Sequence, residues 1–393
     1  NTTGDTNVAV GYQSLDANTT GTNNVGVGDN TLGANTTAAN NTAVGSQALL
    51  SNTTGTQNVA VGAYSLDAST TASYNTGVGY RALSANTSAQ ENAAFGTDAL
   101  LATTEGGRNA AFGAYALTSH TTGANNTAVG YISLGATTTG TQNTSLGYQA
   151  GDAITTGSYN VTIGANGGGG ITTGDQNIAI GQGSMNAACT GDTNTVVGDS
   201  ALASNTSGSD NTVLGAAAMN ANTTGASNTA IGRDALDSNT TADHNVAVGK
   251  ESLHTNTTGA SNTALGNFSL ALNTTASNNT AIGYSALLAN TTGAQNTAVG
   301  KEAGDSITTG SNNVALGYEA LGKTTTGGDN TAVGRAASLD NTTADGNVAI
   351  GNESLENNTT GSNNVGVGKQ AGRNVGGAGN VIVGTGGGIN NTS

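Results

Sequence analysis

The chain has 393 residues, of which 62 are Gly, none is Pro or Trp, and only 8% are charged. Soluble proteins carry about 25% charged residues, so most of this surface is expected to be neutral and polar. The formal net charge of −15 argues against nucleic acid or an anionic membrane as a partner. A single cysteine, Cys189, excludes an internal disulfide, and no apolar run approaches the roughly 20 residues that cross a bilayer.

One repeat runs through the whole sequence. Glycines recur every 17 residues from Gly11 to Gly368, and one 16-residue interval leads to Gly384, which gives 23 copies. With this Gly as position 5, position 1 is Asn in every copy and the consensus is N-[TV]-A-[VIL]-G-x-x-[AS]-L-x-x-N-T-T-G-x-x. No composition shift or Pro-rich linker divides the chain. We therefore expect one continuous repeat domain over 1–393, ending in an irregular coil at 374–393.

Each repeat predicts one short β-strand. Segments such as 41–45 are apolar and are followed by Thr, Asn and Gly, which are poor helix formers. Seventeen residues are also too few for a pair of helices. The expected fold is all-β, a parallel β-solenoid (β-roll or β-helix) of about 23 coils in which each coil is hydrogen-bonded to the next.

An exchange between two positions indicates the core. Position 9 is usually Leu and position 12 usually Asn, but where position 9 is Gly, position 12 becomes Ile or Val. Both positions are therefore expected to reach one interior slot, because an unfilled slot would cost several kcal/mol. Position 4, which is always apolar, is expected to supply a second filler. The predicted core fillers are Val10, Leu15, Val44, Leu49, Ile154, Ile171, Ile307 and Val375.

The Asn at position 1 predicts a ladder of stacked amides, each donating to and accepting from its neighbours. The alternative is turn chemistry, in which Asn is selected for a local backbone bond before the strand. The ladder is represented by Asn7, Asn24, Asn41, Asn58, Asn126, Asn177 and Asn296.

Position 3 is nearly always small, which suggests a smooth face for close packing of chains. The candidate oligomer face is formed by Ala9, Ala43, Ala60 and Ala128. We expect the chain to associate with itself, as a homotrimer or as an end-to-end polymer. The alternative is that the small row only fits a thin solenoid interior.

The segments Asn126 to Leu134 and Asn296 to Ala303 resemble the head repeats of trimeric autotransporter adhesins, and the Asn-Thr-Thr-Gly segments resemble repeats of phage tail fibres. The resemblance implies a left-handed parallel β-roll, association of three chains and binding to a host surface. This sequence departs from those adhesins in its longer coil, and it shows neither their stalk and anchor nor the self-cleaving chaperone of many phage fibres.

Two surface rows are candidate binding sites. The first holds the position 6 tyrosines Tyr12, Tyr80, Tyr131, Tyr148, Tyr284 and Tyr318, whose rings suit a host glycan or protein. The second holds Thr pairs at positions 13 and 14, which resemble the ice-binding faces of solenoid antifreeze proteins. Tolerated surface Tyr and ordinary strand Thr are the plain alternatives for these rows.

Catalysis is not expected, because His120, His244 and His254 lie in different coils without a repeated Ser or Asp partner. No catalytic residue, metal site or cofactor is therefore predicted. The sequence favours a non-enzymatic structural fibre or filament segment, extracellular, at a cell surface or on a virion appendage, with adhesin-like surface presentation. An ice-binding or other surface-array protein is the alternative.

Overall fold

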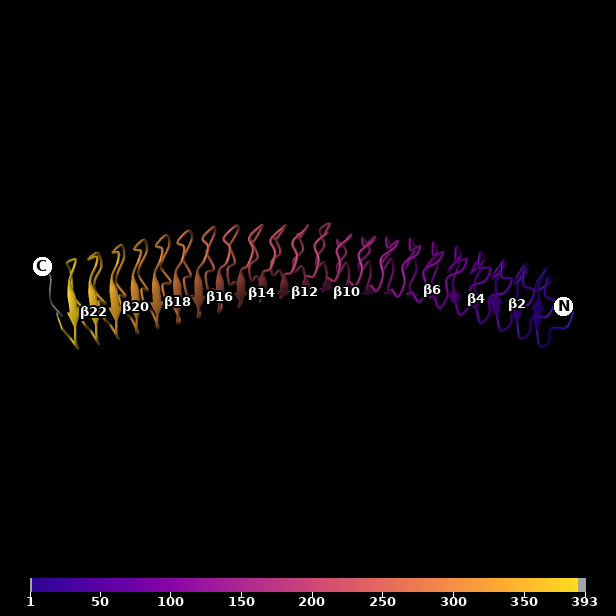
Figure 1. Ribbon diagram of the computed structural model, residues 1–393, viewed down its shortest axis with the longest axis horizontal. Coiled ribbons are helices and arrows are strands. Elements are labelled where there is room, and N and C mark those ends of the chain that lie inside the picture. Colours follow the sequence, from indigo (N-terminus) through magenta and orange to yellow (C-terminus); the bar gives the residue numbers. More distant parts are fainter. Residues whose placement is uncertain (1, 388–393) are drawn as a thin grey trace. The chain divides into compact units, whose positions relative to one another are not determined.

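The structure is a computed structural model that describes residues 2–387. These residues contain 23 β-strands and no helix, in two compact units formed by 1–194 and 195–393. Each unit is a parallel β-solenoid with one three-residue strand per 17-residue coil (Figure 1). The predicted fold class is thus confirmed. Left-handedness and a single continuous domain stay predictions, and part of the 374–393 coil lies outside the described residues.

The first unit contains β1 (Val8–Val10), β2 (Val25–Val27), β3 (Thr42–Val44), β4 (Val59–Val61), β5 (Thr76–Val78), β6 (Ala93–Phe95), β7 (Ala110–Phe112), β8 (Thr127–Val129), β9 (Thr144–Leu146), β10 (Val161–Ile163) and β11 (Ile178–Ile180). The second contains β12 (Thr195–Val197), β13 (Thr212–Leu214), β14 (Thr229–Ile231), β15 (Val246–Val248), β16 (Thr263–Leu265), β17 (Thr280–Ile282), β18 (Thr297–Val299), β19 (Val314–Leu316), β20 (Thr331–Val333), β21 (Val348–Ile350), β22 (Val365–Val367) and β23 (Val381–Val383).

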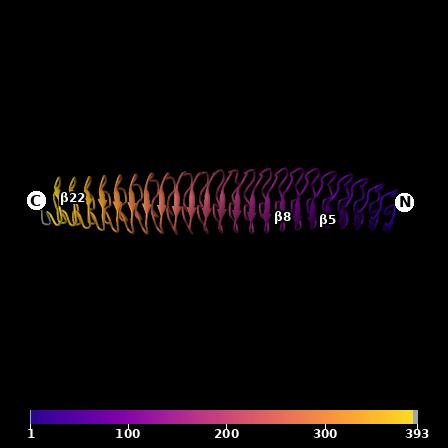
Figure 2. The ribbon, with the colours of Figure 1, turned by 60° about the horizontal axis from the view of Figure 1, so that its bottom comes forward.

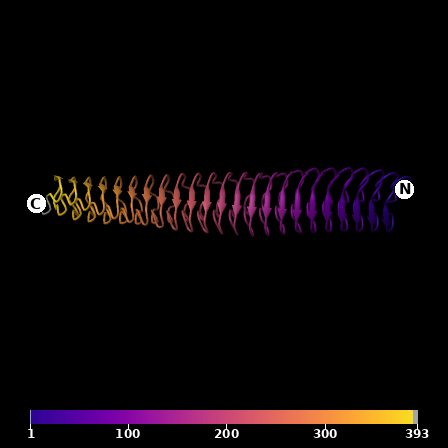
Figure 3. The same cartoon turned by 90° about the horizontal axis from the view of Figure 1, so that it is seen from below.

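Within each unit, neighbouring strands lie side by side and pair in parallel, with equivalent positions opposite each other (Figures 2 and 3). In β16 and β17, for example, Thr263 is opposite Thr280 and Leu265 is opposite Ile282. Backbone hydrogen bonds also join consecutive coils outside the strands, as between Leu236 N and Ser252 O at 2.9 Å. Each coil is therefore attached to the next around most of its circumference.

The invariant Gly at position 5 has a steric cause. Gly215 has a φ of +146°, which L side chains rarely adopt, and a Cβ there would lie 2.4 Å from the carbonyl oxygen of Gly232 in the next coil. The same approach recurs along the row, so the backbone turns out of the strand at a point where no side chain fits.

Three other positions per coil, 7, 9 and 17, adopt the left-handed conformation with residues other than Gly. Leu49 at position 9, for example, has a φ of +50°. This conformation costs about 1–2 kcal/mol per residue, whereas complete burial of a Leu side chain contributes about 1.5–3 kcal/mol. Burial of Leu49 offsets the strain of the turn that places it inside.

Gly304, whose φ is +58°, shows how positions 9 and 12 exchange the core side chain. A Cβ at Gly304 would lie 3.0 Å from Ile307 Cδ1 and 3.1 Å from Leu287 Cδ2 of the preceding coil. Ile307 thus occupies the slot that Leu287 fills one coil earlier. Gly removes the strain at position 9, and the apolar side chain enters from position 12 instead.

The Asn residues at position 1 are buried from Asn24 to Asn364, whereas Asn7 in the first coil is half-buried. Asn41 represents the pattern. Its backbone N–H donates to Asn24 Oδ1 at 3.0 Å, and its Nδ2 donates to the carbonyl of Gly55 at position 15 of the same coil at 2.9 Å. Its own Oδ1 accepts the backbone N–H of Asn58 at 2.9 Å. Asn58 Nδ2 also donates to Asn41 Oδ1 at 3.2 Å, which is the amide–amide contact of the expected ladder. The bonds to the backbone are an addition that the sequence did not indicate.

A second ladder at position 12 was not predicted. Asn239 Nδ2 donates to Asn222 Oδ1 at 2.9 Å and to the carbonyl of Ala242 at 3.0 Å. Asn228 at position 1 also donates to this Ala242 carbonyl, at 2.9 Å. Where position 12 is Asn, as in this coil, the position 15 carbonyl can therefore accept from two buried amides.

Two predictions about the strand were wrong. Val10 and Val44, predicted as core fillers, are 57% and 37% exposed, whereas Leu15, Leu49, Ile154, Ile171, Ile307 and Val375 are buried. Ala43, Ala60 and Ala128, predicted as an oligomer face, are fully buried inside the coil, and Ala9 is exposed in the first coil. Side chains alternate along a strand, so position 3 points inward while positions 2 and 4 point outward.

The first prediction concerns the position 1 ladder. Asn177→Leu removes the bonds from Nδ2 to Gly191 O and from the backbone of Asn194 to Oδ1, both 2.9 Å. It leaves buried polar groups unpaired at about 1–3 kcal/mol each, so we expect a loss of about 3 kcal/mol or more in urea unfolding. Gln176→Leu, at the exposed neighbouring position, is the control. Equal stability of both variants would contradict the buried ladder.

The second prediction concerns position 5. Gly215→Ala forces a methyl group into the next coil and into a disfavoured φ. We expect a loss of at least about 2 kcal/mol in unfolding free energy, from strain and steric clash. Gly346→Ala is the matched control, since Gly346 stands at position 17, where most coils carry larger residues with a similar φ. A similar loss in both variants would refute the steric explanation.

Candidate functional site

The outward face of the sheet is the most extended candidate surface. It consists of the position 2 and position 4 side chains of every coil and is called the outward stripe below. Position 4 is Val, Ile, Leu or Phe in all 23 coils, and position 2 is Val, Thr, Ala or Ile. None of these side chains is buried in the described strands. The stripe therefore exposes apolar side chains on every coil of both units.

The predicted tyrosines at position 6, which are Tyr12, Tyr80, Tyr131, Tyr148, Tyr284 and Tyr318, are all exposed. The structure adds a partner type that the sequence did not indicate, an aromatic ring at position 7 of the preceding coil. Tyr115 meets Tyr131 edge-on with ring centroids 5.8 Å apart, and Tyr131 stacks on Tyr148 at 5.7 Å. A 16-residue spacing between aromatic residues is the signal that would have revealed such pairs.

Several rings of this corner are covered by the chain's own cations. Arg81 lies 5.1 Å from the ring centroid of Tyr80, and Lys301 lies 5.5 Å from that of Tyr318. Such cation–π contacts contribute about 0.5–1 kcal/mol at exposed sites. The Tyr row is thus partly occupied by internal contacts and is not one uniform open platform.

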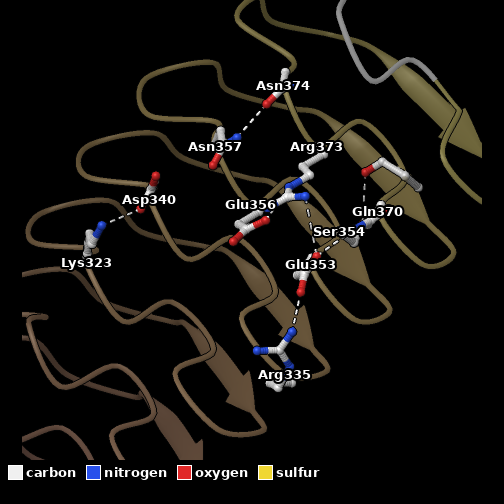
Figure 4. A network of polar contacts seen from close by, with 11 residues as sticks. Lys323, Arg335, Asp340, Glu353, Ser354, Glu356, Asn357, Gln370, Arg373 and Asn374 are labelled. Atoms are coloured by element: carbon white, nitrogen blue, oxygen red, sulfur yellow. Dashed lines mark hydrogen bonds and ion pairs between the residues drawn. The ribbon is translucent and has the colours of Figure 1, made fainter.

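Charged side chains of the second unit form a network that joins neighbouring coils (Figure 4). Glu353 accepts a hydrogen bond from Gln370 at 2.7 Å and pairs with Arg335 and Arg373. The hydrogen bond from Gln370, followed by the two arginines, lowers the pKa of Glu353. Because these side chains are at the surface, such pairs contribute little to stability. The network therefore links neighbouring coils at the surface without adding much to stability.

The Thr rows are not equivalent. At position 13 the hydroxyl donates to the position 13 carbonyl of the next coil, as from Thr223 Oγ1 to Thr240 O at 2.9 Å. At position 14 the side chain, such as Thr224, is exposed. Only one Thr of each pair therefore presents a hydroxyl outward.

The three histidines occupy different environments. His244 is exposed, His254 is half-buried with Nδ1 3.3 Å from Asp234 O, and His120 is buried at position 12. His120 lies within hydrogen-bonding distance of Thr103 and Asn126. Among the described residues, no group of His, Cys, Asp and Glu is arranged to hold a metal ion. Cys189 is buried.

Two recesses carry polar residues. One, of about 450 Å³, is lined by Glu91, Glu105 and Arg108. Another, of about 210 Å³, is lined by Glu302, Asp305 and Glu319. Burial, followed by repulsion from the other two carboxylates, raises the pKa of Asp305 to about 6. Hydroxyl side chains also line the two recesses, Ser88 and Thr122 in the first and Ser306 in the second.

In comparisons with known proteins, no protein-family model matches the chain and no curated sequence is significantly similar to it. Residues 2–387 also include no helix that is long and apolar enough to cross a membrane. The chain is a parallel β-solenoid repeat protein with 17-residue repeats.

The third prediction concerns His120, whose burial lowers its pKa from 6.5 to about 4. The folded state holds the neutral ring, so its contribution to stability is complete above pH 6.5 and is lost as the pH falls toward 4. Between pH 7.5 and 4.5 the loss is about 2–3 kcal/mol. We expect His120→Asn to remove this loss in urea unfolding, while His244→Asn at an exposed position keeps it. Identical pH profiles for both variants would refute the assignment.

Proposed function

We propose that the chain is a non-enzymatic structural segment of an extracellular fibre or adhesin shaft, which associates with itself. The observation that carries the proposal is the identity of the contact between coils throughout both units. The position 1 Asn bonds to the coil before it and the position 5 Gly closely approaches the coil after it in the same way at most steps. A solenoid joined in this way gains length by adding coils without changing any contact.

The surface chemistry supports the same proposal. Uncharged faces and charged corners suit an element that spans distance and presents residues at regular intervals. The resemblance of the repeats to adhesin heads and phage tail fibres adds the cell surface or virion as the location. The exposed position 6 tyrosines are the proposed contact for a host glycan or protein. No catalytic step is part of the proposal, because the histidines belong to separate coils.

Ice binding is the second candidate, and the exposed Thr row at position 14 favours it. The position 13 hydroxyls already donate to backbone carbonyls, as at Thr223, which leaves one row instead of a two-dimensional array. Thermal hysteresis separates the two candidates, since a fibre segment has no reason to produce it.

The fourth prediction tests the structural role. Deletion of residues 228–261 removes two complete coils and restores the repeat across the junction. We expect a folded protein whose length in electron micrographs falls by about 10 Å, since strands are 4.7–4.9 Å apart. A matched deletion of 228–253, which breaks the repeat, should unfold the neighbouring coils.

Immunogold labelling of the cells or virions that produce the chain tests the location. Label along extracellular fibres supports the proposal. Label confined to the cell interior would overturn it.

A further inference from the structure

The outward stripe poses a physical problem, because it leaves apolar side chains at least partly exposed on every coil. Phe95, Leu146, Leu214 and Leu265 at position 4 are among the exposed large apolar residues. Soluble monomers rarely expose a continuous apolar patch of more than a few hundred Å². Such a surface is expected to be covered by a partner.

We propose that the outward stripe of each unit packs against the same stripe of a second copy of the chain. This inference rests on the self-association included in the proposed function and names the surface responsible. It replaces the position 3 row, which lies inside the coil.

Charge points to a copy of the same chain as the occupant. The chain carries a net charge of −15, so two copies repel each other over most of their surfaces. Positions 2 and 4 carry no charged residue in any of the 23 coils, whereas the corner positions 6 and 7 carry many, such as Lys250 and Glu251. The stripe is the face on which two anionic chains approach with least repulsion.

The period of the stripe points to the same occupant. Equivalent positions face each other in every strand pair within each unit, so the position 4 side chains recur once per coil. A second copy presents its own side chains at the same interval. Two such faces can interdigitate along their whole length, at the roughly 10 Å separation of packed sheets.

In the coils with the largest side chain at position 4, the side chain at position 2 is small. The two coils with Phe at position 4, Phe95 and Phe112, have Ala at position 2, Ala93 and Ala110. The two rings stack at 4.9 Å with an interplanar angle of 7°. The small Ala side chains beside the Phe rings limit how uneven the face is. Close packing against another surface requires an even face, whereas contact with solvent does not.

The size of the stripe suffices for a stable contact. Twelve strands in the second unit, about 4.8 Å apart and about 10 Å long, give roughly 500 Å² of face. The eleven strands of the first unit give a face of similar size. Two copies that pair through one such face bury about 1,000 Å² in total, which is the lower bound for a specific interface.

The experiment compares leucines of similar exposure that lie inside and outside the stripe. Leu265 at position 4 is 46% exposed in the stripe, and Leu272 at position 11 is 47% exposed outside it. The test variant is Leu214→Glu with Leu265→Glu, the control is Leu272→Glu, and the readout is the mass from sedimentation equilibrium. Circular dichroism verifies that each variant is folded, as expected for exposed sites.

We expect the wild type and Leu272→Glu to sediment as oligomers and the double variant as a 37.8 kDa monomer. The dissociation constant should rise at least roughly 100-fold, because each contact then buries unpaired carboxylates. Oligomers in all three proteins would contradict the assignment of the stripe as the contact surface. Self-association would then remain and would have to use another surface. A monomeric wild type would overturn both, and the extracellular location would still depend on the immunogold result.

Discussion

The buried asparagine at position 1 is the interaction on which the coil depends. The amide of Asn41, for example, bonds to the backbone of the next coil and to the position 15 carbonyl of its own coil, so it fixes both the stacking and the closure of the loop. A buried amide is costly unless all its groups are paired. The cost of breaking the pattern explains why Asn stands at this position in all 23 copies.

The other constraints follow from this closed, narrow coil. Position 3 points into this coil, where a Cβ at Gly77 would lie 2.6 Å from Ser65 Oγ and 3.5 Å from Leu66 Cδ1. Space inside is therefore limited to Ala or slightly larger residues, and the larger apolar residues of the strand are placed outside. The apolar outer face is a consequence of the thin interior, and it is this face that gives the protein a surface for association.

The sequence was sufficient for the repeat, the strand in each coil, the Asn ladder and the exchange between Leu and Ile in the core. The prediction of the inward side chains was wrong because it relied on hydrophobicity. Val44 is more apolar than Ala43, and yet it points outward. The second ladder was missed because Asn at position 12 is interrupted by Ile, Thr and Ser. Contacts between aromatic residues such as Tyr115 and Tyr131 depend on the turn conformation, which the residue types alone do not reveal.

Side-chain amide exchange measured by NMR tests the central claim most directly. Asn278 and Asn279 are adjacent, but Asn278 is exposed at position 17 and Asn279 is fully buried in the ladder. The same contrast recurs at Asn312 and Asn313. The account predicts slow exchange for the Nδ2 groups of Asn279 and Asn313 and fast exchange for those of Asn278 and Asn312. Equal, fast exchange within each pair would contradict a coil built on buried asparagines.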